Sequence, residues 1–227
     1  MLLALGSARD GFAQLPSTGT QGWYTGNVWV QFPGHLRFLG TAELNAGTNY
    51  SYDQWIAGGA FAYQWKHINR IDHLVNINSD KESRVVAGLG FEYLWTDKEG
   101  KSSGEDRVVL LATPRYRPWG RWLLEDRNRL EFRWVDGDYS TRYRNRVTVE
   151  RDLLVHAFRF TPYASAELFY DFASGTIDEQ QYAVGIQWPY RRLFMVETYY
   201  LYQYSHSSPD NINVFGITLN VYLRNGL

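Results

Sequence analysis

Apolar and polar residues alternate along most of the chain, and no convincing helical periodicity interrupts this pattern. Period-two alternation between turn residues is typical of β-strands whose two faces meet different surroundings. The pattern predicts about twelve strands, each near or above the roughly 9–11 residues that a tilted strand needs to cross a bilayer. The predicted strands cover residues 22–32, 35–46, 53–65, 69–78, 83–96, 106–117, 121–134, 141–155, 157–171, 180–189, 192–204 and 212–223. The segment 69–78 alternates only loosely. Pro33-Gly34 forms a tight connection where a long external loop is expected, so ten strands is the alternative count.

The two faces of a predicted strand differ in chemistry. In the segment 121–134 one face begins and ends in Trp122 and Trp134 and is apolar apart from Asp126 and Asn128, while the other face is charged. A soluble barrel would turn the apolar face inward, and a membrane barrel would turn it toward lipid. We favour the membrane barrel because the apolar faces end in Trp or Tyr, as an interfacial aromatic girdle does. A soluble barrel of about twelve strands would also have a large interior to fill.

Composition supports this fold class and excludes several functions. Aromatic residues make up 17% of the chain, and no stretch approaches the ~20 consecutive apolar residues that a membrane helix needs. The chain has no Cys, which excludes disulfides, thiol catalysis and Cys-based metal sites. The formal net charge is −1, so no nucleic-acid partner is expected. The His residues lack metal-ligand spacing and no phosphate-binding Gly loop is present, so no cofactor is expected.

The chain divides into two parts. Residues 1–14 resemble a poor or truncated export signal, with a disordered tail as the alternative, and residues 15–227 form a single barrel domain. In the later half, longer polar connections alternate with tight ones, which is typical of outer-membrane barrels and predicts that both termini lie on the periplasmic side. The longer connections are 98–105, 136–140, 172–179 and 205–211, and the tight ones are 118–120, the region of His156, and 189–191.

The most specific motif is a run of Arg and Glu residues on the polar faces of two neighbouring strands. A turn near Asp138 would place Glu131 opposite Arg144, and Arg129 opposite Arg146. The residues predicted to form a polar network in the lumen are Arg127, Arg129, Glu131, Arg133, Arg142, Arg144, Arg146 and Glu150. Further acidic residues available from other strands as counter-charges are Glu43, Glu92, Glu167 and Glu197.

Two roles are open for this network. Rings of Arg set anion preference in pores, so the network could bind or select a small anionic solute. Alternatively, Arg and Glu side chains satisfy each other across a narrow lumen and close it. We favour the closed lumen, which would conduct poorly.

The same motif carries a family resemblance. The stretch 127–134, followed by 142–146, resembles a family of bacterial outer-membrane barrels known as domain of unknown function 2490, and the stretch 213–219 resembles its final strand. The resemblance extends over residues 22–223 and implies a location and a fold, without an established activity. Gly216, with Leu219 and Val221 after it, resembles a barrel-assembly signal, although Val214 replaces its usual polar residue.

One segment near the C-terminus resembles a lipid-hydrolase site. His206 and Ser208, with Asn220 twelve positions later, resemble the His-x-Ser pattern of outer-membrane lipid hydrolases. A Ser nucleophile needs a His base within hydrogen-bond reach and a third group that orients the His. Asn220 is expected deep in the final strand on the lumen side, and therefore far from His206.

The sequence thus predicts a non-enzymatic protein of the bacterial outer membrane with an Arg/Glu-filled lumen. A narrow pore or transporter for small anionic solutes is the first alternative, and an outer-membrane lipid hydrolase is the second. The expected partners are outer-membrane lipid, lipopolysaccharide and the barrel-assembly machinery.

Overall fold

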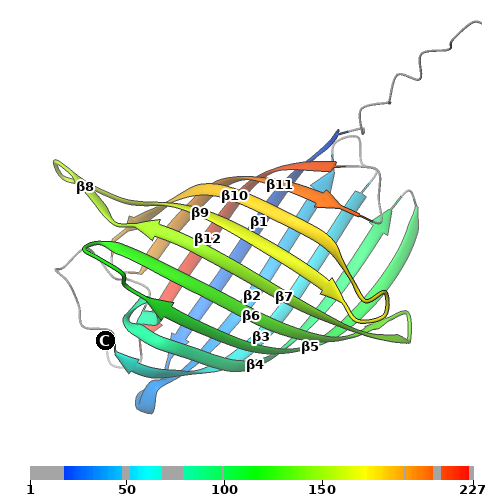
Figure 1. Ribbon diagram of the computed structural model, residues 1–227, viewed down its shortest axis with the longest axis horizontal. Helices are drawn as coiled ribbons and strands as arrows, with labels where there is room; N and C mark the ends of the chain where they lie inside the picture. The colour runs from blue at the N-terminus through cyan, green and yellow to red at the C-terminus, as the bar shows by residue number, and fades with distance from the viewer. Residues whose placement is uncertain are drawn as a thin grey trace, which may run out of the picture.

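The computed structural model describes residues 18–47, 52–67, 79–98, 100–191, 193–206 and 211–224. Within these ranges the chain is almost entirely β-strand (Figure 1). The strands are β1 (Thr18–Gln31), β2 (Leu36–Gly47), β3 (Tyr52–His67), β4 (Ser83–Lys98), β5 (Lys101–Tyr116), β6 (Trp122–Val135), β7 (Asp138–Arg151), β8 (Leu153–Val155), β9 (Phe158–Asp171), β10 (Thr176–Tyr190), β11 (Phe194–Ser205) and β12 (Asn211–Arg224). Two short 3-10 helices are described as well, η1 (Pro33–His35) and η3 (Ser79–Glu82).

The described strands form one sheet that closes into a barrel. Sequential strands pair antiparallel, β9 pairs with both β7 and β10, and β8 only extends the edge of β9. Eleven strands therefore form the wall, and β1 closes it against β12. The predicted all-β, up-and-down barrel of about twelve strands is confirmed.

The pairing of β1 with β12, which closes the barrel, contradicts the predicted position of the two termini. Each hairpin reverses the chain, so in a barrel of eleven strands the last strand runs in the same direction as the first. β1 and β12 accordingly pair in parallel, with Thr18 beside Asn211 and Gln31 beside Arg224. The start of β1 and the end of β12 lie at opposite ends of the barrel (Figure 1), so the prediction of both termini on one side was wrong.

Most of the predicted strands are present, with ends that differ by a few residues, and the predicted strand 141–155 is divided into β7 and β8. The predicted strand 69–78 lies outside the described residues, and β3 and β4 on either side of it pair directly. The predicted long connections 98–105 and 136–140 are mostly strand, because their polar residues continue the ladders of β4–β5 and β6–β7. The predicted alternation of long and short connections is therefore wrong at these positions.

A two-residue turn sets the register of β6 and β7. Asp136 and Gly137 both have positive φ, 49° and 97°, and Val135 pairs with Asp138. Asp-Gly is a preferred pair for such a turn because both central residues must adopt positive φ. The turn places Glu131 opposite Arg142, and Arg129 opposite Arg144. The predicted pairing was two residues away, because it assumed a turn centred on Asp138.

Inside the barrel, two tyrosine rings cover glycines of the neighbouring strand. Tyr163 of β9 pairs with Gly185, and Tyr199 of β11 pairs with Gly216. A Cβ atom at Gly185 would lie 2.7 Å from the Tyr163 ring, and one at Gly216 would lie 2.0 Å from the Tyr199 ring. Glycine is required at both positions so that the rings can lie against the barrel wall.

Candidate functional site

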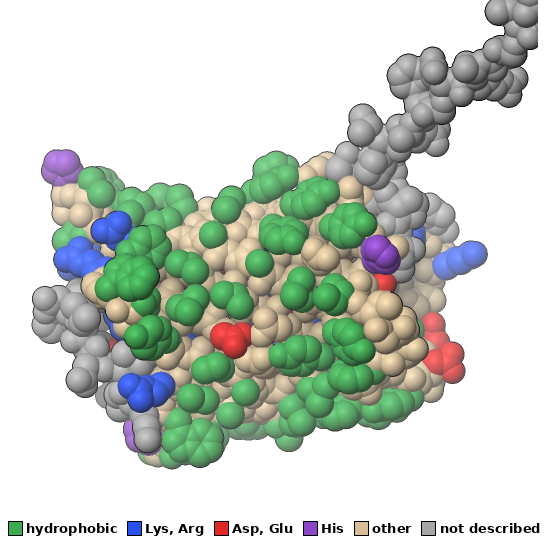
Figure 2. Space-filling model, viewed as in Figure 1, with side chains coloured by type: hydrophobic (Ala, Val, Ile, Leu, Met, Phe, Trp, Pro, Cys, Tyr) green, Lys and Arg blue, Asp and Glu red, His purple; other side chains and the backbone are tan. Residues whose placement is uncertain are grey.

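The barrel is apolar outside and polar inside. Strand alternation turns most of the charged residues of β4 to β9 toward the lumen, where Glu131 is 0% exposed and Glu167 is 2% exposed. Hydrophobic side chains cover much of the outer wall (Figure 2). Exposed residues on this wall include Trp55, Phe61, Leu89, Phe91, Val184, Phe215 and Ile217. This polarity is the reverse of that of a soluble barrel.

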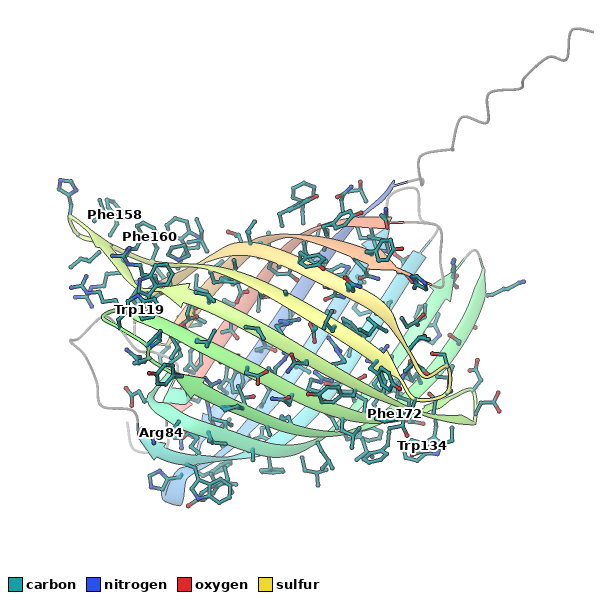
Figure 3. The ribbon with its side chains drawn as sticks, viewed as in Figure 1. Arg84, Trp119, Trp134, Phe158, Phe160 and Phe172 are labelled. Atoms are coloured by element: carbon teal, nitrogen blue, oxygen red, sulfur yellow. The ribbon has the colours of Figure 1, made fainter. Side chains whose placement is uncertain are left out.

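Aromatic side chains gather at both ends of the barrel. Trp119, Phe158 and Phe160 lie at one end, and Trp134 and Phe172 lie at the other (Figure 3). Trp119 is 69% exposed and Phe158 is 75% exposed. Two aromatic bands therefore bracket the apolar outer wall, which matches the arrangement that interfacial girdles have in membrane barrels.

Glu131 is the centre of the first group of ion pairs in the lumen. Arg142 donates to its Oε2 through Nε at 2.9 Å and Nη2 at 2.7 Å. Arg144 donates to Oε1 through Nη1 at 3.1 Å, and Arg129 Nη2 lies 2.9 Å from the same oxygen. One fully buried carboxylate thus meets three guanidinium groups.

Glu167 of β9 is the centre of the second group. Arg144 donates to its Oε1 through Nε at 3.0 Å, and Arg127 donates through Nη2 at 3.1 Å. Arg146 donates to Oε2 through Nε at 2.7 Å. Arg144 therefore bridges both buried carboxylates, and its guanidinium carbon lies 4.3 Å from the ring centroid of Phe169. These contacts connect β6, β7 and β9 through their side chains.

Two more acidic residues extend the contacts toward β4 and β5. Arg129 donates to both carboxylate oxygens of Glu92, at 3.0 and 2.9 Å. Arg107 Nε donates to Glu105 at 2.6 Å, and Arg133 donates to the same carboxylate. We call the whole set the charged network: Arg107, Arg127, Arg129, Arg133, Arg142, Arg144, Arg146, Glu92, Glu105, Glu131 and Glu167. It holds seven arginines and four glutamates, and therefore an excess of positive charge.

The structure places seven of the eight predicted lumen residues in this network. Glu150 lies apart, because its carboxylate pairs with Lys81 Nζ at 2.7 Å. Of the four predicted counter-charges, Glu92 and Glu167 belong to the network. Glu43 instead accepts hydrogen bonds from Thr25 and Asn45, and Glu197 accepts one from Tyr163.

Sequence reasoning missed several charged residues that face the lumen. Glu105 and Arg107 join the network, but Glu105 had been assigned to a loop. Their spacing of two residues would have placed both on one strand face. Arg115 pairs with Glu125 at 2.6 Å, and Lys81 also donates to Gln187 at 2.7 Å.

Some donor capacity in the network is not used. Among the described residues, the buried Nε atoms of Arg127 and Arg129 have no hydrogen-bond partner. The side chains of Arg127 and Arg146 are 26% and 31% exposed, respectively. The network therefore presents accessible guanidinium groups as well as buried ion pairs.

The hydrolase pattern is not assembled within the described residues. Asn220 is buried and accepts hydrogen bonds from Asn27 Nδ2 at 3.0 Å and Trp29 Nε1 at 3.1 Å. It pairs with Met195, far along β11 from His206, and Ser208 lies outside the described residues. Across all the residues that the structure describes, no three His, Asp or Glu side chains form a group that could hold a metal ion. The described helices include none long and apolar enough to cross a membrane.

Residues 20–213 match the model of a family described as Protein of unknown function (DUF2490). The chain belongs to this family. No curated protein matches the chain. The match to DUF2490 spans the complete charged network, and it confirms the resemblance found on the Arg/Glu hairpin. The description of DUF2490 assigns no activity.

The central position of Glu131 leads to a stability prediction. Replacing Glu131→Gln removes the negative charge that three arginines share and should lower the free energy of unfolding by about 3–5 kcal/mol. The matched control is Glu43→Gln, because the hydrogen-bond donors to Glu43 are the neutral residues Thr25 and Asn45. The control should lose less than about 1 kcal/mol. Urea unfolding in detergent micelles would measure both, and equal losses would contradict the central role of Glu131.

Proposed function

We propose that this chain spans the bacterial outer membrane as a β-barrel and serves there as a non-enzymatic envelope protein with a closed lumen. The observation that carries the proposal is the reversed polarity of the barrel, with an apolar outer wall between two aromatic bands and charged residues inside. A continuous apolar surface of this extent is unfavourable in water but meets hydrocarbon at no such cost.

The strand lengths support the same environment. The eleven strands of the wall are 12 to 16 residues long. A strand tilted in a bilayer needs only about 9–11 residues to cross the hydrocarbon. The remaining residues of each strand would extend into the headgroup regions, where lipid and lipopolysaccharide are the expected contacts. The final strand, with Gly216 and Leu219, would be the segment that the barrel-assembly machinery recognises.

The charged network supports a closed lumen. Glu131 and Glu167 are each surrounded by guanidinium groups from two strands, β6 and β7, which immobilises long side chains inside the barrel. Farther along the lumen wall, Tyr163 of β9 and Tyr199 of β11 are held against glycines of the neighbouring strands. The protein would then act through its outer surface and its loops rather than by conducting solutes.

One observation favours the alternative of a narrow anion-selective pore. The charged network has more arginines than glutamates, and Arg127 and Arg146 are partly exposed to the lumen. Guanidinium groups that line a narrow passage attract anions and repel cations. A pore would require a continuous water-filled path past the charged network.

The membrane location is tested by extraction and gel mobility. The protein should require detergent for extraction from cell envelopes, and its electrophoretic mobility should shift on heating, because a closed barrel resists SDS until its strands separate. Solubility without detergent, together with the absence of any heat-dependent shift, would contradict the proposal.

The state of the lumen is tested by conductance in planar bilayers. The wild-type protein should give no steady channels, because the network closes the lumen. Steady anion-selective channels would overturn the closed lumen and support the pore. In that case Arg127→Gln and Arg146→Gln should reduce anion selectivity, whereas Glu43→Gln should leave it nearly unchanged.

A further inference from the structure

A group of polar side chains lies on the apolar outer wall, at the middle of β6 and β7. Asn128 pairs directly across the strands with Asn145. Asp126 and Tyr143 lie two residues away from them on the same outer face. We call these four residues the outer polar cluster. They are distinct from the charged network, which occupies the opposite, lumen-facing side of the same strands.

The surroundings of the cluster are apolar. The outer face of β6 begins at Trp122 and ends at Trp134, and Asn128 lies midway between these two residues. An acidic group is visible within the otherwise hydrophobic front face of the barrel (Figure 2). If the wall faces lipid, the cluster lies near the middle of the bilayer. A carboxylate and two amides are unfavourable there, and barrel formation alone gives no reason for them.

The cluster satisfies most, but not all, of its hydrogen-bonding groups. Asn145 Nδ2 donates to Asp126 Oδ1 at 2.6 Å and to Asn128 Oδ1 at 3.1 Å. Tyr143 donates to Asn128 Oδ1 at 2.5 Å, and Asn128 Nδ2 donates to the Asp126 backbone oxygen at 3.2 Å. An amide nitrogen carries two hydrogens. Among the described residues, one hydrogen of Asn128, the Asp126 Oδ2 atom and the Asn145 Oδ1 atom therefore have no partner.

We propose that the outer polar cluster is the contact surface between two copies of this chain within the membrane. The inference rests on the proposed membrane location. Two barrels inserted in the same direction are related by a two-fold axis along the membrane normal, which keeps each residue at the same depth in both copies. Asp126 and Asn128 are two residues apart along β6, so their side chains reach across this offset in depth. The unused hydrogen of Asn128 in one copy then meets the unused Asp126 oxygen of the other, and the reverse pair forms by symmetry.

Small residues around the cluster permit the close approach that this contact needs. Ala112 of β5 is the cross-strand neighbour of Asn128, and Ala166 of β9 is the neighbour of Val147. Both alanines are exposed on the outer wall. Small side chains at a membrane interface let two backbones approach, and buried polar side chains then form hydrogen bonds across it. A second copy supplies a matching donor and acceptor at the required depth.

Cysteine cross-linking tests the proposed contact, because the chain has no cysteine of its own. Val147→Cys lies beside Asp126, and Val28→Cys of β1 is the matched control on the far side of the barrel. The two valines are similarly exposed, 39% and 42%. In vesicles at high lipid dilution, oxidation should convert Val147→Cys into disulfide-linked dimers and leave Val28→Cys monomeric. Equal cross-linking of the two variants, or none of either, would overturn the proposal.

Two further variants, each made together with Val147→Cys, test whether the dimer depends on the polar side chains of the cluster or only on contact between the apolar walls. Replacing both Asp126→Leu and Asn128→Leu should abolish the dimer, whereas Asp126→Asn keeps an acceptor oxygen and should retain it. Unchanged cross-linking in the double leucine variant would also overturn the proposal. Heat-dependent gel mobility is measured on every variant. A barrel that shifts on heating but does not cross-link contradicts only the dimer, whereas loss of the shift in the wild-type protein contradicts the membrane location.

Discussion

The charged network inside this barrel depends on two buried carboxylates and on the guanidinium group that bridges them. Glu131 and Glu167 lie on different strands, and Arg144 donates to both. Removing a charge from water is costly unless opposite charges and hydrogen bonds compensate it inside the protein. The strands that carry the three side chains must therefore keep one register, since a slip of a single residue would turn every side chain of a strand to the opposite face.

The same alternation that buries charge inside presents hydrocarbon-compatible residues outside. A lumen lined with Arg and Glu and an outer wall of Leu, Val, Phe and Trp are two consequences of one period-two pattern. The odd number of wall strands adds a further constraint, because only a parallel pair of β1 and β12 can close the sheet. Where the pattern is broken on the outside, at Asp126 and Asn128, the structure points to a protein contact rather than to lipid.

Much of this architecture could be predicted from the sequence, and the failures have physical causes. Period-two alternation located the described strands, because burial on one face imposes it directly. The number of strands in the wall, the register between strands and the partner of each charged side chain depend on turns and on residues distant in sequence. The Asp136–Gly137 turn shifted the pairing of β6 with β7 by two residues. Glu150 was grouped with the arginines by its position on the strand, but Lys81, distant in sequence, is its partner.

If the outer wall faces lipid and the inner face does not, oxygen dissolved in the membrane should reach only side chains on the outer wall. Ala183 and Val184 of β10 test it most directly, because they are adjacent, point to opposite sides of the barrel wall, and belong to neither the charged network nor the outer polar cluster. Each would be replaced by cysteine, and a nitroxide spin label attached in reconstituted vesicles. The account predicts frequent collisions with membrane-dissolved oxygen for the label at Val184 and few for the label at Ala183. Equal oxygen accessibility, or the reverse order, would contradict it.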